Sequence, residues 1–254
     1  MKTVGFWGAT AAVITLASPA NSADMPNPIY AKAPLAQTWT GFYAGVNVGG
    51  GISTNSLTNA QAPTQVGDSP ALGITVTSGN TNGAVGGVQV GYNFQNGPVV
   101  YGIEGEFDGS SLQGHNLYRS FGASGDVNIK TNWIATVTGR IGAMFHNDTL
   151  LYAKGGVAFD NNSFSITAQN PFSSGAYPKT SETRVGWTMG FGAEYMIGSN
   201  WTAKLEYDYL DFGGKNLAFA TGTDTNSFTT TAAFSATSNQ QMHTVKAGLN
   251  YKLY

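Results

Sequence analysis

Charged and apolar side chains alternate in the stretch WTAKLEYDYL at 201–210, where Lys204, Glu206 and Asp208 occupy every second position. Because side chains of a β-strand point alternately to the two faces of a sheet, these three residues share one face and the apolar residues share the other. Cations and carboxylates on one face can pair with each other or line a path for ions. If the apolar face lies inside, the chain is a soluble sandwich or barrel; if it lies outside, the chain spans a lipid bilayer.

Seven further stretches show the same alternation. They are TGFYAGVNVGG (40–50), GAVGGVQVGYNF (83–94), VVYGIEGEFD (99–108), TNWIATVTGRIG (131–142), LLYAKGGVAFD (150–160), RVGWTMGFGAEYMI (184–197) and MHTVKAGLNYKLY (242–254). A tilted strand that crosses a bilayer needs about 9–11 residues, which each of these stretches provides.

The connections between the eight stretches alternate in length. Short turns at 95–98, 145–149 and 198–200 alternate with long segments rich in Thr, Ser, Asn and Gly, which we expect as loops at 54–82, 110–130, 161–183 and 211–241. An even number of strands with short turns at one end and long loops at the other is typical of bacterial outer-membrane barrels, and we expect the turns in the periplasm and the loops outside the cell.

The composition also favours a membrane barrel. Only 10% of the 254 residues are charged, against about 25% in an average soluble chain. The 34 glycines suit an inner barrel face of small and polar residues. The sequence therefore predicts an all-β fold, an eight-stranded antiparallel up-and-down transmembrane β-barrel. A formal net charge of −2 gives no basic surface for nucleic acid.

The first residues have the features of an export signal. Lys2 gives a positive start, an apolar run follows at 4–17, and small residues allow cleavage after Ala20 or Ala23. We expect a signal peptide at 1–23, a proline-rich periplasmic lead-in at 24–38 and the barrel at 39–254, in the cell outer membrane. Aromatic residues near strand ends predict interfacial girdles. They are Trp39, Phe94, Trp133, Phe159, Tyr195 and Trp201.

A cluster of ion pairs inside the barrel is the main candidate site. Its predicted members are Glu104, Glu106, Arg140, Lys154, Glu194, Lys204, Glu206 and Lys246, with Asp108, Arg184 and Asp208 on the same inner face. Eight strands enclose about enough room for side chains, and buried charges must be paired. We expect Arg140 to pair with Glu104 or Glu106, supported by Lys154 or Lys246. Two interpretations remain open, a lumen plugged by paired charges and a narrow or switchable ion path.

Five segments carry a family resemblance. They are ADMP (23–26), WTGFYAGVNVG (39–49), LLYAKGGVAF (150–159), GWTMGFGAEYMIGSNWTAKLEYDYLDFG (186–213) and HTVKAGLNY (243–251). Together they resemble the outer-membrane immunogenic proteins, small porin-like surface antigens of Gram-negative bacteria. The resemblance implies an eight-stranded outer-membrane barrel exposed to its surroundings. Some members of this family are associated with haem binding and others with envelope integrity, and no catalytic residues carry over.

The C-terminus departs from the pattern of such barrels, which usually end in an aromatic residue two places after the Tyr. Leu253 follows Tyr251 and keeps the outward alternation, whereas the aromatic Tyr254 is one place out of phase. We expect Tyr251, Leu253 and Tyr254 to form a variant of the signal that the barrel-assembly machinery recognises.

Other chemistry has weaker support. His115, with Tyr118 nearby, could contact haem because both residue types can be axial ligands, and an ordinary polar loop is the alternative. Without Cys or a His pair at ligand spacing, we expect no metal site and no cofactor. His243 and Thr244 lie on opposite faces of a strand and cannot form a nucleophile–base pair, so we expect no enzyme.

Two functional hypotheses remain. The first is a surface barrel with a structural, envelope-integrity and exterior-contact role. Its partners would be outer-membrane lipid, lipopolysaccharide, the assembly machinery and an unidentified external ligand. The alternative is a small-solute porin or a barrel that takes up a ligand such as haem.

Overall fold

The structure, a computed structural model, describes residues 38–61, 79–120, 123–146, 148–170, 173–176, 180–219 and 234–253. The expected signal peptide and all of the lead-in except Thr38 lie outside these residues. The described elements are the strands β1 (Gly41–Gln61), β2 (Gly79–Asn96), β3 (Val99–Ser110), β4 (Gln113–Ser120), β5 (Ala123–His146), β6 (Thr149–Asn170), β7 (Ser173–Ala176), β8 (Thr180–Met196), β9 (Trp201–Phe219) and β10 (Phe234–Leu253). In this part of the chain, no helix is long and apolar enough to cross a membrane.

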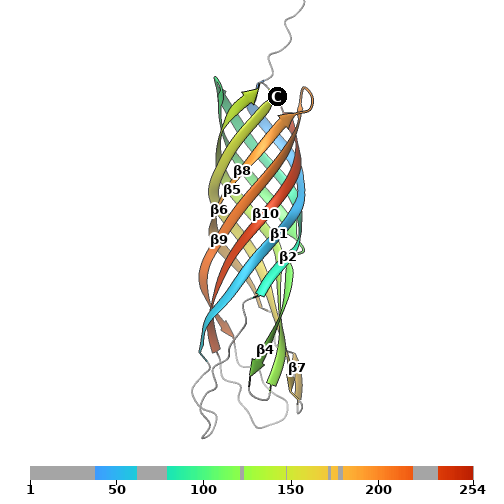
Figure 1. Cartoon of the computed structure of the whole chain (residues 1–254), viewed down its shortest axis with the longest axis vertical. Coiled ribbons are helices and arrows are strands. Elements are labelled where there is room, and N and C mark those ends of the chain that lie inside the picture. The colour runs from blue at the N-terminus through green and yellow to red at the C-terminus, as the bar shows by residue number, and fades with distance from the viewer. Residues whose placement is uncertain are drawn as a thin grey trace, which may run out of the picture. The chain divides into compact units, whose positions relative to one another are not determined.

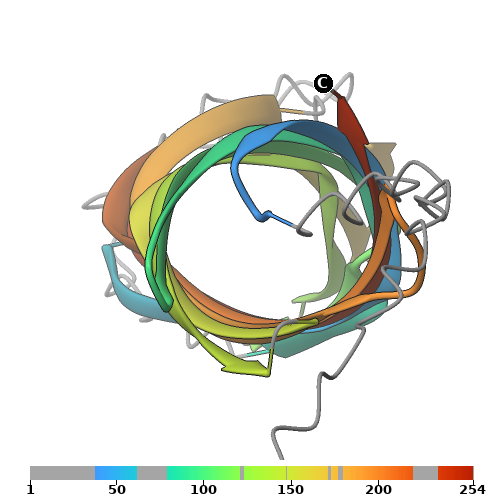
Figure 2. The same cartoon turned by 90° about the horizontal axis from the view of Figure 1, so that it is seen from above.

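The strands form one closed antiparallel sheet. β1 pairs with β2 on one side and with β10 on the other, so the sheet closes on itself. β3 and β4, which are separated only by Ser111 and Leu112, share one position in the wall between β2 and β5. β7 and β8 likewise both pair with β6. The ten strands therefore fill eight wall positions, which confirms the predicted eight-stranded barrel (Figures 1 and 2).

Alternation along each strand separates an apolar outer face from a polar inner face. On β2, Val90 is 60% exposed on the outside, whereas the neighbouring Gln89 is 1% exposed and points inward. In the stretch at 201–210, Trp201 and Leu205 face outward and Lys204 faces inward. A continuous apolar exterior is compatible with lipid rather than water. The apolar face of the alternating strands is thus the outer one.

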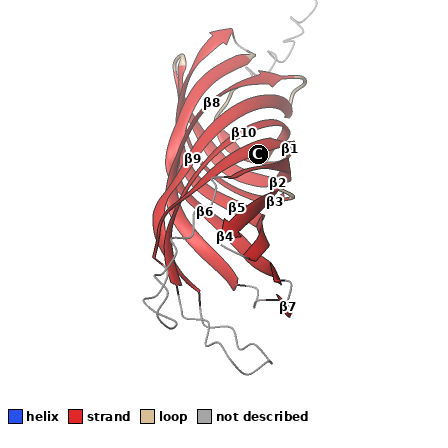
Figure 3. Ribbon diagram, turned by 60° about the horizontal axis from the view of Figure 1, so that its bottom comes forward, coloured by secondary structure: helices blue, strands red, loops and turns tan. Residues whose placement is uncertain are grey.

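The strands continue past the end of the apolar exterior. On β9 the outward residues change from Tyr209 to Asp211, and on β1 they change from Ile52 to Thr54. Beyond this boundary β10 still pairs with both β9 and β1. The wall of long tilted strands, which Figure 3 shows, therefore extends out of the apolar zone. The barrel is therefore longer than the lipid layer it crosses.

This extension corrects the loop bounds expected from the sequence. All four expected loops, at 54–82, 110–130, 161–183 and 211–241, contain strand. They hold β4, β7 and the outer parts of β1, β2, β5, β6, β8, β9 and β10. Apolar residues at every second position mark only the part of a strand that faces lipid on one side. A strand in water needs backbone pairing alone and can carry polar residues on both faces.

One expected girdle residue is also placed differently. Phe94, Tyr195 and Trp201 face outward near the end of the barrel that carries the short turns, which we call the turn end. Trp39 instead is 1% exposed and lies inside the barrel. Its backbone N–H donates to Gln95 Oε1 at 2.8 Å, which turns the chain before β1 inward (Figure 2).

The interior is layered along the barrel axis. From the turn end outward, the inward residues of β6 are Leu150 and Tyr152, then Lys154, then Ala158, and then Asp160. Taken over all strands, a charged layer lies between two groups of apolar residues, although β9 and β10 carry the polar residues Thr202, Asn250 and Lys252 on their inner face at the turn end. The turn-end layer consists of Trp39, Val100, Leu150, Tyr152 and Met196. The outer layer consists of Val85, Leu112, Ile134, Ala158, Leu210, Phe212 and Met242.

Candidate functional site: the ion-pair cluster of the lumen

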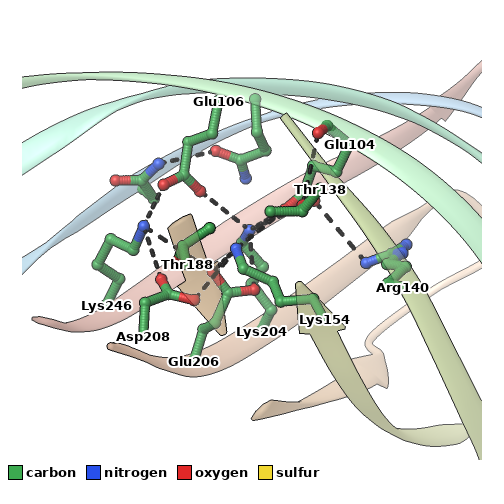
Figure 4. Close-up of polar contacts among 12 residues, drawn as sticks. Glu104, Glu106, Thr138, Arg140, Lys154, Thr188, Lys204, Glu206, Asp208 and Lys246 are labelled. Atoms are coloured by element: carbon green, nitrogen blue, oxygen red, sulfur yellow. Dashed lines mark hydrogen bonds and ion pairs between the residues drawn. The ribbon is translucent and has the colours of Figure 1, made fainter. Parts of the chain in front are cut away.

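Glu104 lies at the centre of the charged layer and is buried. Its carboxylate oxygens lie 3.8 Å from Arg140 Nη1, 3.5 Å from Lys154 Nζ and 3.4 Å from Lys204 Nζ. Tyr43 donates its hydroxyl hydrogen to the same carboxylate at 2.8 Å. Glu104 and its four partners come from five strands, so Glu104 connects opposite walls of the barrel (Figure 4).

Arg140 pairs with two carboxylates from different walls. Besides Glu104 on the neighbouring strand, its Nη1 lies 3.1 Å from Glu194 Oε2 on β8, a strand that does not pair with β5. The guanidinium also lies over the rings of Tyr43 and Tyr152, 4.6 and 5.2 Å from their centroids. Such cation–π contacts favour an arginine at a desolvated position. Of the two partners expected for Arg140, the structure places only Glu104 within ion-pair distance.

Glu106 pairs with lysines instead. Lys246 donates to Glu106 Oε1, and Lys204 Nζ lies 3.6 Å from Glu106 Oε2. Lys246 Nζ also lies 3.0 Å from Asp208 and 3.4 Å from Asp108. The lysine on β10 therefore links carboxylates of β3 and β9 across the lumen (Figure 4).

Three carboxylates of this cluster are close enough to hold a metal ion. Oxygens of Glu104, Glu106 and Glu206 all lie within 4.8 Å of one another. Lys204 Nζ lies 3.4, 3.6 and 3.5 Å from these three carboxylates, respectively. Lys154 Nζ adds a contact of 2.5 Å to Glu206. The chain thus supplies its own cations to the position where a metal would bind.

Uncharged donors serve the remaining carboxylate oxygens. Tyr152 donates to Glu206 Oε2 at 2.7 Å, and Thr202 and Asn250 donate to Glu194 Oε1 at 2.5 and 2.8 Å. These residues were not among the predicted site residues. Each of them lies an even number of positions from a predicted inward residue on the same strand, and this spacing is the sequence signal that could have identified them. The donors matter because a buried carboxylate is costly unless its lone pairs are satisfied.

Glycines on the inner face let these long side chains cross the lumen. A Cβ on Gly156 would lie 2.0 Å from the carbonyl oxygen of Val137, and one on Gly87 would lie 2.5 Å from Asp108 Oδ1. At the outward Gly139, by contrast, a Cβ would meet open space. Close packing at these inner positions therefore requires glycine.

The other candidate residues lie apart from this cluster. Arg184 is directly opposite Asp160, on the far side of the outer apolar layer. His115 and Tyr118 belong to β4 rather than to a loop, and their side chains lie outside what the structure describes.

Of the expected assembly signal, two residues are described. Tyr251 and Leu253 face outward on β10 near its end, with the Tyr251 ring 5.0 Å from that of Trp201. Tyr254 lies outside the described residues.

Known outer-membrane proteins are similar to this chain in sequence. A family model described as the outer membrane protein beta-barrel domain matches residues 9–252. The 31 kDa outer-membrane immunogenic protein of Brucella melitensis biotype 1 is 36% identical over 219 residues, covering 85% of this chain and 84% of the relative. The 22 kDa outer membrane protein of Rhizobium leguminosarum bv. viciae is 30% identical over 203 residues, covering 77% and 78%.

Among solved structures, OprG of Pseudomonas aeruginosa aligns with a TM-score of 0.48 at 11% identity and covers 84% of this chain and 97% of its own. The family model matches almost the whole chain, and the two relatives are outer-membrane proteins by name. Both findings agree with the resemblance seen in the sequence. The chain belongs to the outer membrane protein β-barrel family and is a protein of the outer membrane.

Proposed function

We propose that this protein is a sealed surface barrel that contributes to the envelope and meets the exterior, rather than a pore. The observation that carries the proposal is the layered lumen, in which a charged layer lies between an apolar layer on the outer side and an apolar cluster at the turn end. The charged residues Glu104, Arg140, Lys204 and Lys246 are all buried. Ion pairs that cross the lumen, with apolar side chains on both sides of them, favour a sealed barrel over an open pore.

The energetics of ion transfer support this proposal. A permeating ion would have to shed water beside Leu112 and Met242, both fully buried, and then compete with ion pairs already formed. Burying an unpaired charge costs several kcal/mol. Conduction instead requires sites that bind ions weakly enough to release them.

The part of the barrel beyond the apolar zone supports a role outside the membrane. There the outer surface carries Asn132, Asn161 and Thr183, which are linked by hydrogen bonds of 2.8 and 3.2 Å. Polar walls of this kind can contact lipopolysaccharide headgroups and external molecules. The name of the Brucella relative, an immunogenic protein, supports surface exposure for this chain as well.

We also infer that the protein is not an enzyme. His243 faces outward and accepts or donates a hydrogen bond at 2.7 Å with Tyr207, whereas Thr244 is buried on the inner face. The arrangement supports no nucleophile–base pair at these neighbours.

Planar-bilayer recording of refolded protein tests the seal. We expect no steady, resolvable conductance steps from protein whose folding is verified by heat-modifiable electrophoresis. Conductance steps of uniform size whose frequency rises with protein concentration would refute the seal and favour the alternative of a small-solute porin. A deletion strain provides the matching test in cells. It should become more sensitive to detergent, and restoring the non-conducting wild-type barrel should reverse this change.

A further inference from the structure

Trp39 occupies the turn-end mouth of the barrel without being part of its wall. It precedes β1 and belongs to no strand, yet its side chain is buried in the turn-end layer with Val100 and Leu150. Gly41, at the start of β1, has a φ of 137°, a backbone conformation that other residues rarely adopt. This conformation lets the chain leave the wall and bend toward the barrel axis, as the blue start of β1 does in Figure 2. We call residues 38–41 the strap.

The wall around this mouth is apolar on β3, β6 and β8 but polar on β9 and β10. Asn250 is directly opposite Thr202 and shares the inner face of β10 with Lys252. Thr202 and Asn250 donate to the Glu194 carboxylate at 2.5 and 2.8 Å. Glu194 in turn lies 3.1 Å from Arg140 Nη1. A row of polar groups therefore leads from the mouth to the ion-pair cluster, past the end that Trp39 fills.

Polar contacts near the surface hold the strap in place. The backbone N–H of Trp39 donates to Gln95 Oε1 at 2.8 Å, and the backbone N–H of Gln95 donates to Thr40 Oγ1 at 2.9 Å. Lys252 donates from Nζ to the carbonyl oxygen of Thr38. Gln95 is only half-buried, so water can compete for its bonds. The indole Nε1 of Trp39 is buried without a hydrogen-bond partner within the described residues, which weakens the closed position further.

The outer apolar layer closes the lumen in a different way. Its side chains come from β2, β5, β6, β9 and β10, and from Leu112 between β3 and β4, so it is built from the wall itself. Leu112 and Met242 are fully buried in it. Strands paired on both sides cannot move these residues aside without breaking the ladder. Displacing Trp39 therefore leaves the outer apolar layer in place.

We infer that Trp39 is a releasable stopper of the turn-end mouth. When the strap swings out about Gly41, water and small ions reach Glu194 and Arg140 along β9 and β10. They go no further, because the outer apolar layer stays closed. The barrel then has a charged vestibule at its turn end and still no through path. The inference rests on the proposed seal, but its test is access to the lumen rather than conduction, so the two can fail separately.

The reaction rate of a single buried thiol tests this inference, since the chain has no cysteine of its own. Thr138→Cys places the thiol in the charged layer, beside Glu104 (Figure 4). The probe is methyl methanethiosulfonate, a small neutral reagent, acting on refolded protein in micelles. We expect Trp39→Ala to raise the rate about tenfold or more, because the space left by an indole beside polar groups admits water. Gln95→Ala, which removes the acceptor of the Trp39 N–H, should raise it less.

Two controls separate opening of the mouth from general loosening of the barrel. Trp201→Ala removes an outward indole at the same end and should leave the rate of the reporter unchanged. Asn55→Cys places a buried thiol beyond the outer apolar layer, four residues further out on β1 than Gly51, whose Cβ position would lie 3.4 Å from Leu112. Its rate should not respond to Trp39→Ala. Heat-modifiable electrophoresis verifies that each variant is folded.

Several results would overturn the inference. A Thr138→Cys rate that is the same with and without Trp39 would show that the indole closes nothing. A rate that Gln95→Ala leaves unchanged would make Trp39 a fixed plug, and an equal rise with Trp201→Ala would indicate general loosening. Conductance steps from Trp39→Ala would show that the outer apolar layer does not close the lumen by itself. Steps from the wild-type barrel would refute the proposed seal itself, whereas a silent wild type with an unchanged thiol rate would refute the stopper alone.

Discussion

Replacing Arg140 by methionine should strongly destabilise the folded barrel. Methionine keeps much of the length of the side chain but leaves Glu104 and Glu194 without the cation that lies 3.8 and 3.1 Å from them. Both carboxylates are buried, so water cannot replace the guanidinium without rearrangement. Removing one partner of a buried ion pair costs roughly 3–5 kcal/mol, and we expect Arg140→Met to lower the free energy of unfolding by this amount.

A set of double-mutant cycles separates the partners of Arg140. At an effective dielectric constant of about 20, unit charges 3.1 Å apart attract by about 5 kcal/mol and charges 3.8 Å apart by about 4 kcal/mol, before desolvation and side-chain ordering offset part of each. The coupling energy should therefore be largest with Glu194→Gln and smaller with Glu104→Gln. Glu106→Gln is the matched control, because Glu106 pairs with Lys204 and Lys246.

The assay is reversible denaturant unfolding of the barrel in lipid vesicles for each single and double variant. Coupling to Glu106 that equals or exceeds coupling to Glu194 would refute the arrangement of the cluster. Coupling near zero for all three pairs would indicate a hydrated lumen, in which such pairs are worth about 0–1 kcal/mol. Conductance steps from the same protein would then have to appear.

Three further predictions concern the wall of the barrel. Val90→Arg, on the lipid face, should cost about 2–4 kcal/mol of unfolding free energy in vesicles, whereas Asn82→Arg, outward on the same strand but beyond the apolar zone, should cost about 0–1 kcal/mol. Gly156→Ala should cost about 1–3 kcal/mol because its Cβ would overlap backbone atoms, and Gly139→Ala, whose Cβ meets open space, should be nearly neutral in the same titration. Since the chain has no cysteine, a single Ser199→Cys should react with an impermeant maleimide only after lysis, and Asn82→Cys should react on intact cells.

Each of these comparisons has a contrary outcome. Equal costs for the two arginine variants would refute the assigned outer face, and equal costs for the two alanine variants would refute the close packing of the inner face. Labelling of Ser199→Cys on sealed cells would refute the assigned orientation, in which the short turns lie in the periplasm.

The sequence by itself determined the barrel and the direction of its side chains. Strict alternation, eight strand-length segments and low charge predicted the fold, because a strand between lipid and a polar lumen must carry apolar and polar residues in turn. Parity alone also assigned Glu104, Glu106 and Arg140 to the inner face, where the structure places them. The outer parts of the strands escaped prediction because they have no lipid on either side and therefore no apolar alternation.

Only the tertiary structure decided which inward residues meet. Parity gives the face of a residue but not its height in the barrel, which depends on the stagger between strands. Arg140 is directly opposite Lys154, a like charge, yet it pairs with Glu194 from a strand that β5 does not contact. A long side chain such as that of Arg140 can cross the narrow lumen to a carboxylate on another wall. That carboxylate is within its reach only because the sheet closes into a barrel. The inward turn of Trp39 follows from the same closure, because only a complete ring offers a mouth for it to fill.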